Sequence, residues 1–289
     1  MYLQHFGLAE YPFQLTPNTA YFYRRAGHRE ALDVLGGALA TGEGFIRVTG
    51  EVGTGKTLLC RLLLRELGEE WVRAMIPNPA LDPESLRQVV ADELGVRIPE
   101  EANAHTVLAR LHERLLQIAE AGQRSVLVID EAQVMSDESL EMVRLLTNLE
   151  TERAKLLQVV LLGQPELDRR LAEPHLRQLR QRCTFRYELG TLPRDQVDDY
   201  LHHRLQTAGY RGRSPFAPAA VRQLARAAQG IPRTLNTLAH KALLAAYADD
   251  APTVEKRHVA RAVADTETAY AGWFGRWGRS RGAQSGDHG

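Results

Sequence analysis

One eight-residue segment has the pattern of a phosphate-binding loop. It fits G-x-x-x-x-G-K-[ST] and comprises Gly50, Glu51, Val52, Gly53, Thr54, Gly55, Lys56 and Thr57. Glycines let backbone N–H groups turn inward around an anion, where side chains would collide, and a following helix adds partial positive charge. Lys56 is expected to reach the β- and γ-phosphates, and the Thr57 hydroxyl to ligate Mg²⁺. With Leu58, the next residue, these positions form the predicted nucleotide-binding set.

Two carboxylates follow the apolar run 125–129. Because a buried parallel strand delivers its C-terminal residues to the ligand-binding edge of a sheet, we expect Asp130 and Glu131 near the loop. Asp130 would then hold Mg²⁺, directly or through water, and Glu131 would polarise the attacking water. The alternative is an ordinary acidic turn, which the loop at 50–57 disfavours. Together the two motifs predict an ATPase that uses ATP and Mg²⁺.

Predicted strands and helices, which must position these motifs, alternate along the chain. Apolar runs predict strands at 45–49, 71–76, 125–129, 156–162 and 184–189. Helical periodicity covers 28–40, 56–67, 84–94, 106–121 and 138–149. Such alternation is typical of a mostly parallel sheet with helices on both faces. We therefore expect a three-layer α/β fold of the P-loop NTPase class.

The character of the sequence changes after Leu192. Helical patterns at 194–208, 217–229, 232–248 and 255–267 are separated by glycines and prolines, which predicts an all-helical lid domain. We place the nucleotide-binding α/β domain, with an aromatic N-terminal lead-in, at 1–192 and the lid at 193–268. Residues 269–289 are rich in Gly, Ser and Arg, and we predict a disordered tail there.

Some lead-in residues are weaker site candidates. Tyr21 and Phe22 are candidates for the wall of an adenine pocket, although core packing explains most of these aromatics. His28, at the start of the first predicted helix, is interpreted as structural.

Composition restricts the class of protein. The chain has 289 residues, with 36 Lys plus Arg and 36 Asp plus Glu, so its net charge gives no reason to invoke nucleic acid or an anionic membrane. Local basic patches remain open, because net charge hides the distribution. The two cysteines, Cys60 and Cys183, lack the spacing of a zinc or redox motif. No signal peptide and no transmembrane stretch is evident, so we expect a cytoplasmic protein, free or peripheral at the inner membrane.

The motifs in combination resemble those of AAA+ ATPases. The segments 50–57 and 130–131 match that class, as does Gly230-Ile231-Pro232-Arg233 in the helical region. More narrowly, the chain resembles the general secretion pathway A (ExeA/GspA-like) family over about residues 1–268. Besides the phosphate loop, this resemblance is carried by MYLQHFGL at 1–8, PFQLTP at 12–17, LTNLET at 146–151 and GQPEL at 163–167.

Members of this family that are fused to the secretion machinery continue into a membrane helix and a peptidoglycan-binding domain. Because this chain stops before such segments, we expect it to be most similar to the free-standing ATPases of mannose-sensitive haemagglutinin (type IV) pilus biogenesis.

The resemblance implies three further site residues. Gln164 matches a first sensor that contacts the γ-phosphate or the water, and a turn opening the next helix is the alternative. Arg182, with Arg177 second and Arg180 also open, matches the arginine finger that reaches a neighbour's γ-phosphate. A solvated basic helix face is the alternative there. Arg233 matches a second sensor in the lid, and a plain arginine at a helix start is its alternative.

The resemblance also implies partners. We expect a homo-oligomer that supports assembly of a type IV pilus or secretion complex at the inner membrane. A DNA-associated AAA+ ATPase, such as a transposition target selector or a Holliday-junction or clamp-loading motor, shares the same motifs and is the alternative. Neutral net charge disfavours it without excluding nucleic acid. A nucleotide-binding scaffold without hydrolysis is a third alternative, which Glu131 disfavours.

Overall fold

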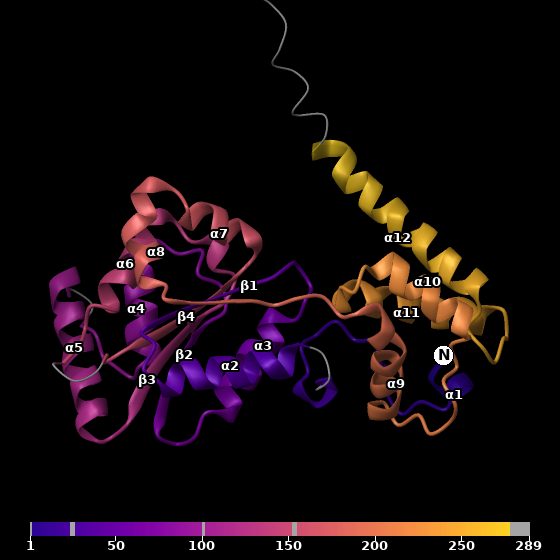
Figure 1. Ribbon diagram of the computed structural model, residues 1–289, viewed down its shortest axis with the longest axis horizontal. Coiled ribbons are helices and arrows are strands. Elements are labelled where there is room, and N and C mark those ends of the chain that lie inside the picture. Colours follow the sequence, from indigo (N-terminus) through magenta and orange to yellow (C-terminus); the bar gives the residue numbers. More distant parts are fainter. Residues whose placement is uncertain (1, 24–26, 100–101, 152–154, 278–289) are drawn as a thin grey trace, which may run out of the picture. The chain divides into compact units, whose positions relative to one another are not determined.

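The computed structural model describes residues 2–23, 27–99, 102–151 and 155–277, with side chains up to 266 (Figure 1). The chain divides into two compact units. One, the sheet unit, comprises Pro17–Thr191. The other, the helical unit, comprises Met1–Thr16 together with Leu192–Gly289. The two are described separately below.

The sheet unit is built on five parallel strands. They are β1 (Phe45–Thr49), β2 (Trp71–Ile76), β3 (Arg124–Ile129), β4 (Gln158–Gly163) and β5 (Phe185–Glu188). Their order in the sheet is β2-β3-β4-β1-β5, and every pairing is parallel. Every residue of β1 and β4 is buried, as expected for strands in a parallel sheet that is covered on both faces. The buried Arg47 of β1 forms an ion pair with Asp168. The predicted fold class is confirmed.

Helices cover both faces of this sheet (Figure 1). On one face α2 (His28–Ala40) and α3 (Lys56–Glu66) pack against Ile46, Val48 and Val128. The other face packs against α4 (Pro83–Glu93), α5 (Ala104–Glu120), α6 (Asp137–Leu146), α7 (Pro165–Leu171) and α8 (Arg177–Arg182). Periodicity did not predict α7 and α8, because seven and six residues span too few turns to show a repeat.

The helical unit contains α1 (Tyr2–Phe6), α9 (Val197–Thr207), α10 (Pro218–Ala228), α11 (Pro232–Ala248) and α12 (Lys256–Trp277). Residues 2–16 belong to this unit, whereas the sequence predicts that they belong to the α/β domain. The buried guanidinium of Arg204 donates to the Pro12 carbonyl at 2.6 Å, and the Tyr2 hydroxyl bonds His240 Nδ1 at 3.0 Å. These bonds and the buried aromatic side chains of the segment, rather than a periodic pattern, hold it against the helical unit.

Helix α12 is longer than expected. It continues through 269–277, where the sequence predicts a disordered tail, while 278–289 lie outside the described residues. A glycine inside a helix costs only about 1 kcal/mol relative to alanine, so glycines alone do not end it. Within the described residues, no helix is both long and apolar enough to cross a membrane.

Candidate functional site

Glycine geometry shapes the loop between β1 and α3. Gly53 and Gly55 have φ angles of 82° and 102°, in the left-handed region that side chains disfavour. A Cβ on Gly50 would lie 2.8 Å from the Leu189 carbonyl oxygen, so the loop approaches the segment after β5 closely. The Thr54 hydroxyl donates to the Glu51 carbonyl at 2.8 Å and holds the turn. Each predicted loop residue thus lies in one tight strand-to-helix connection.

His28, the first residue of α2, supports this loop from inside the unit. Its Nε2 donates to the Thr54 carbonyl oxygen at 2.7 Å. Burial lowers the pKa of His28, which favours the neutral ring, and the bond to Thr54 opposes that shift in part. Because a carbonyl can only accept, the bond to Thr54 requires a proton on Nε2. His28 is therefore a structural residue with a specific role, because its bond to Thr54 holds the backbone next to Gly55.

Gly55→Ala is expected to disrupt the loop. The new Cβ would lie 2.7 Å from His28 Nε2 on a backbone with φ of 102°, so binding of ATP should weaken at least about tenfold. Gly37→Ala is the matched control, since Gly37 lies in α2 with nothing within 4 Å of an added Cβ. It should leave binding unchanged and stabilise the fold by about 0.5–1 kcal/mol. Nucleotide titration and thermal unfolding of both variants check this; equal behaviour would contradict it.

Lys56 begins α3 with its side chain turned back into the loop. The ammonium donates to the carbonyl oxygens of Gly50 at 2.8 Å and Glu51 at 3.0 Å, and only 5% of the residue is exposed. Burial lowers the pKa of Lys56, while the carboxylates of Glu131 and Asp130 oppose the shift. Because the positive charge of this ammonium is buried, binding of an anion such as phosphate beside it is favourable.

Thr57 and Asp130 bring two hard oxygen atoms together. The Thr57 hydroxyl donates to Asp130 Oδ2 at 2.5 Å across elements 73 residues apart in sequence. Burial raises the pKa of Asp130, and the bond from Thr57 opposes that shift. A hydroxyl beside a carboxylate at the mouth of a phosphate loop is the oxygen donor set that Mg²⁺ prefers when phosphates supply the remaining ligands. These residues therefore fit the predicted metal.

Glu131 leaves the strand in an unusual conformation. Its φ is 52°, in the left-handed region, and its N–H donates to Asp130 Oδ1 at 2.9 Å. Glu131 Oε2 accepts from Gln133 Nε2 at 2.6 Å and from Gln164 Nε2 at 3.4 Å. The structure thus brings Gln164, which follows β4, to Glu131, and its role as a sensor stays a prediction. Gln133 was not singled out from the sequence, because nothing in its spacing shows that it turns back toward Glu131.

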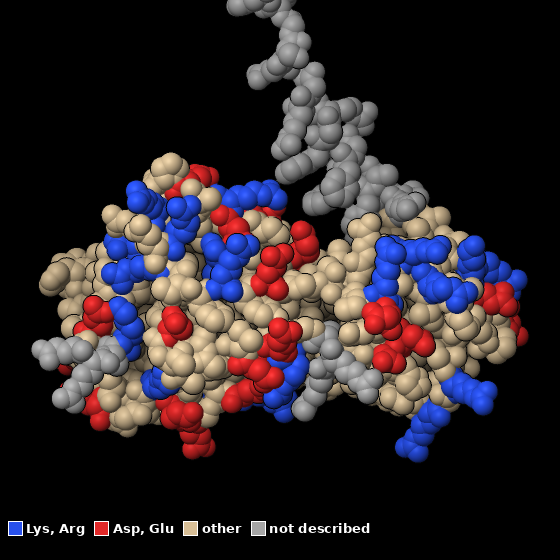
Figure 2. Space-filling model, in the orientation of Figure 1, with Lys and Arg blue, Asp and Glu red and all other residues tan. Residues whose placement is uncertain are grey.

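The predicted arginines lie on α8 of the sheet unit and on α11 of the helical unit. Figure 2 shows Lys and Arg side chains gathered over the region of α6, α7 and α8. Arg177 and Arg180 are exposed on α8, and Arg182 ends that helix beside a cavity of about 370 Å³ near the start of β1. Arg233 is exposed in the first turn of α11, in the helical unit. Within one chain, the structure does not bring Arg182 to the loop.

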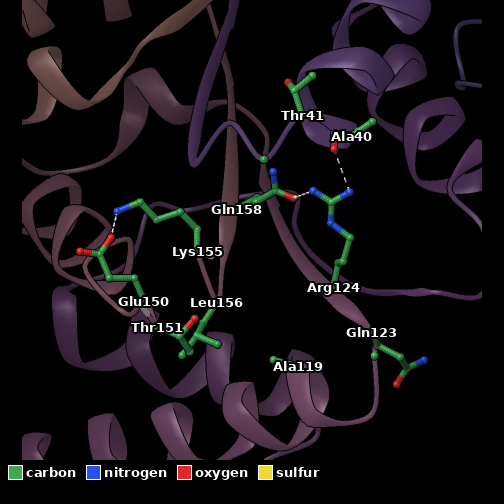
Figure 3. Close-up of a pocket in the computed structure, with 12 residues that line it drawn as sticks. Ala40, Thr41, Ala119, Gln123, Arg124, Glu150, Thr151, Lys155, Leu156 and Gln158 are labelled. Carbon is green, nitrogen blue, oxygen red and sulfur yellow. Dashed lines mark hydrogen bonds and ion pairs between the residues drawn. The ribbon is translucent and has the colours of Figure 1, made fainter. Parts of the chain in front are cut away.

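A larger cavity, of about 880 Å³, opens at the opposite edge of the sheet (Figure 3). Its lining includes Arg124 and Gln158, the first residues of β3 and β4, and therefore belongs to the amino ends of the strands. The Arg124 guanidinium donates to the carbonyls of Leu39 and Ala40 and to Gln158 Oε1, and Lys155 forms an ion pair with Glu150. These charged groups are already bonded within the chain, whereas the phosphate-loop motif lies at the carboxyl edge of the sheet.

Fold and site define the class of protein. A parallel sheet of this order, with a lysine-containing loop after β1 and an acidic pair after β3, is that of an AAA+ P-loop ATPase. A family model described as an AAA domain matches residues 39–171. The chain belongs to the general secretion pathway A family of these ATPases, because it is 46% identical over 248 residues to general secretion pathway protein A of Aeromonas hydrophila.

That match covers 86% of this chain but 45% of the relative, so the chain spans about half the length of the curated protein. Solved structures share the fold at low identity. The ORC1 protein of Aeropyrum pernix in complex with DNA is 23% identical with a TM-score of 0.64, covering 89% of this chain and 69% of that one. The ORC2 protein of the same organism, in ADPNP and ADP complexes, is 15% identical with a TM-score of 0.63, covering 87% and 72%. The RuvB Holliday junction branch migration motor of Thermotoga maritima is 16% identical with a TM-score of 0.53, covering 82% and 67%.

Proposed function

We propose that this chain binds ATP with Mg²⁺ and hydrolyses it to ADP and phosphate. The observation that carries the proposal is the 2.5 Å bond between Thr57 and Asp130, which joins the phosphate loop to the acidic pair. Lys56 would bind the β- and γ-phosphate oxygens, and the backbone N–H groups of 50–57 would surround them. When bound by Thr57 and Asp130, Mg²⁺ supplies charge neutralisation on the phosphates.

Glu131 is the proposed general base. Its carboxylate lies one residue beyond Asp130 and would accept a hydrogen bond from the attacking water, orient it and receive its proton. Gln164 would stabilise the same arrangement through its amide, since it already lies 3.4 Å from Glu131 Oε2. Arg233, as a second sensor, remains part of the proposal for the helical unit.

We propose that the working form is a homo-oligomer in which Arg182 completes a neighbour's site. Arg182 precedes the amino end of β5, whereas Lys56 follows the carboxyl end of β1, and β1 and β5 are parallel neighbours. The five residues of β1 span about 17 Å at roughly 3.3 Å per residue. An arginine at the amino edge of the sheet is too far from the phosphate loop of its own chain. It can act as an arginine finger only at the site of a second subunit.

A mixing experiment tests this arrangement. Arg182→Ala and Lys56→Ala should each lose nearly all turnover, by about 10³-fold for the finger. Mixing them should restore phosphate release, because the Lys56→Ala subunit supplies an intact Arg182 to the intact loop of the other. Arg169→Ala, on an exposed arginine of α7, is the control and should keep full activity. No recovery over a range of protein concentrations, or full activity of Arg182→Ala, would contradict the trans role.

We further propose that ATP turnover drives assembly of a type IV pilus or secretion complex, with the chain cytoplasmic and peripheral at the inner membrane. The support is the identity to a protein named for the general secretion pathway. A DNA-associated role is the alternative outcome of a binding assay. ATP-dependent binding to DNA that weakens steeply with salt would favour it, whereas co-purification with pilus or secretion proteins would favour the assembly role.

A further inference from the structure

The side chain of Gln133 reaches back to the carboxylate of Glu131. We infer that Gln133 is a positioning residue that sets the direction of the Glu131 carboxylate, and that Arg170 of α7 holds the turn carrying both residues. The inference rests on the proposed role of Glu131 as general base. The turn after the acidic pair would then contribute to hydrolysis as well as to folding.

The hydrogen bonds fix which way the Gln133 amide faces. Gln133 Oε1 accepts from the backbone N–H of Gln164 at 3.0 Å, and a backbone N–H can only donate. The amide nitrogen must therefore face the other way, where Nε2 donates to Glu131 Oε2 at 2.6 Å. One amide thus ties the carboxylate after β3 to the backbone at the end of β4.

Close packing at the end of β4 leaves this amide little freedom. A Cβ on Gly163 would lie 3.2 Å from Gln133 Oε1 and 2.8 Å from Leu167 Cδ2. The absence of a side chain at Gly163 therefore lets the amide sit against the strand. Glu131 itself is only partly buried, and it also accepts from Gln164 Nε2, at 3.4 Å. Gln133 is the shorter and stronger restraint on the carboxylate.

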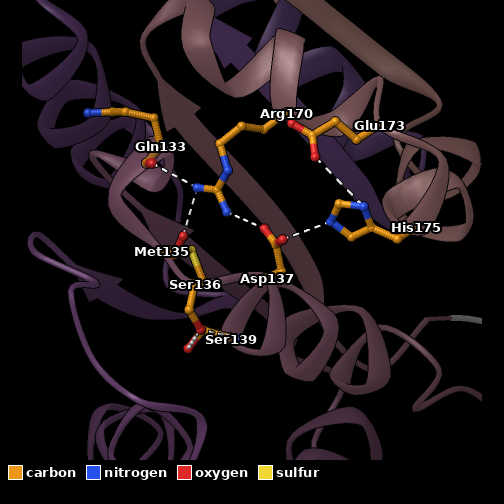
Figure 4. A network of polar contacts seen from close by, with 8 residues as sticks. All are labelled: Gln133, Met135, Ser136, Asp137, Ser139, Arg170, Glu173 and His175. Atoms are coloured by element: carbon orange, nitrogen blue, oxygen red, sulfur yellow. Dashed lines mark hydrogen bonds and ion pairs between the residues drawn. The ribbon is translucent and has the colours of Figure 1, made fainter. Parts of the chain in front are cut away.

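Arg170 clamps the backbone of the same turn (Figure 4). Its Nη1 donates to the carbonyls of Gln133 at 2.8 Å and Met135 at 2.7 Å, and its Nη2 forms an ion pair with Asp137. Asp137 Oδ2 also bonds His175 Nε2 at 2.7 Å. Hydrogen bonds from Arg170 and His175 hold the pKa of Asp137 below its usual value, so the clamp is charged.

The bonds of the Gln133 side chain and those of the Arg170 guanidinium hold the same turn after Glu131. The side chain of Gln133 bonds Gln164, and its carbonyl accepts from Arg170. The turn after Glu131 is therefore held both to the predicted sensor and to α7. A misplacement of about 1 Å in a reacting group can cost 10²-fold in rate. Loss of the Gln133 amide should therefore change turnover far more than binding.

Gln133→Met, which keeps the length of the side chain and removes its hydrogen bonds, tests the inference in the full chain. We expect kcat to fall about 10- to 100-fold, with the KM for ATP and the Kd of a non-hydrolysable ATP analogue changed less than about twofold. Val134→Ala is the matched control, because Val134 follows in the same turn with 48% exposure. It should keep wild-type kcat.

A double-mutant cycle separates positioning from general destabilisation. If Gln133 acts through Glu131, Gln133→Met should add nothing to the residual rate of Glu131→Gln. An equal further loss in that background, or a wild-type kcat for Gln133→Met alone, would overturn the inference. If instead Glu131→Gln keeps wild-type turnover, the proposed general base is wrong, and that failure is distinct from failure of the positioning role.

A second variant keeps the inference testable if Gln133→Met folds poorly. Arg170→Lys keeps the charge beside Asp137 and loses the planar fork that reaches both carbonyls. It should lower kcat several-fold while the melting temperature and analogue binding stay near wild type. An unchanged kcat would remove Arg170 from the clamp that we assign to it.

Discussion

Replacing Glu131 with glutamine is expected to lower ATP turnover by about 10²- to 10⁴-fold. The change keeps the size of the side chain and removes the group that accepts a proton from water. Lys56, Thr57 and Asp130 are untouched, so binding of Mg-ATP should persist. Phosphate release measured beside titration of a fluorescent ATP analogue separates the two effects.

Glu166→Gln is the matched control for that experiment. Glu166 is an exposed acid at the start of α7 that pairs with Arg169. Among the carboxylates that oppose the lowering of the Lys56 pKa, Glu166 has the smallest effect. Its neutralisation should leave turnover within about twofold of wild type, because exposed ion pairs contribute little. Equal losses from both variants would show that net charge near the loop, rather than the carboxylate at 131, governs the rate.

Lys56→Ala should weaken binding of Mg-ATP by about 100-fold or more and abolish measurable turnover. The ammonium would contribute charge-assisted hydrogen bonds to phosphate, each typically worth about 1.5–3 kcal/mol, and loss of two such bonds exceeds two orders of magnitude in affinity. It also holds the loop, since it bonds the carbonyls of Gly50 and Glu51. Calorimetric titration with ATP and Mg²⁺ measures the loss directly.

Two lysine variants sharpen the result. Lys56→Arg keeps the charge, but a planar guanidinium does not fit the buried cradle of a compact ammonium, so affinity should still fall. Lys155→Ala removes an ion-paired lysine at the opposite edge of the sheet and should leave affinity unchanged. Wild-type binding by Lys56→Ala would refute the assignment of the phosphate loop.

Local patterns determined which parts of the molecule the sequence predicted. The strands appear as apolar runs and the loop as a contiguous motif, so β1, α3 and the pair Asp130–Glu131 were expected where they lie. Gln133 depends on the left-handed backbone of Glu131 and on a partner 31 residues away, neither of which a motif encodes. The same holds for residues 1–16, whose anchor, Arg204, is 192 residues from Pro12.

The anchoring of residues 1–16 to the helical unit has a consequence for synthesis of the chain. Arg204 and His240, which bond these residues, are made about 190 or more residues later than the residues they bond. At roughly 5–20 residues per second, that interval lasts about 10–40 s. During it the ring of Phe13 and the carbonyl of Pro12 cannot yet contact Phe216 and Arg204. The segment that contains Pro12 is thus made long before its native contacts can form.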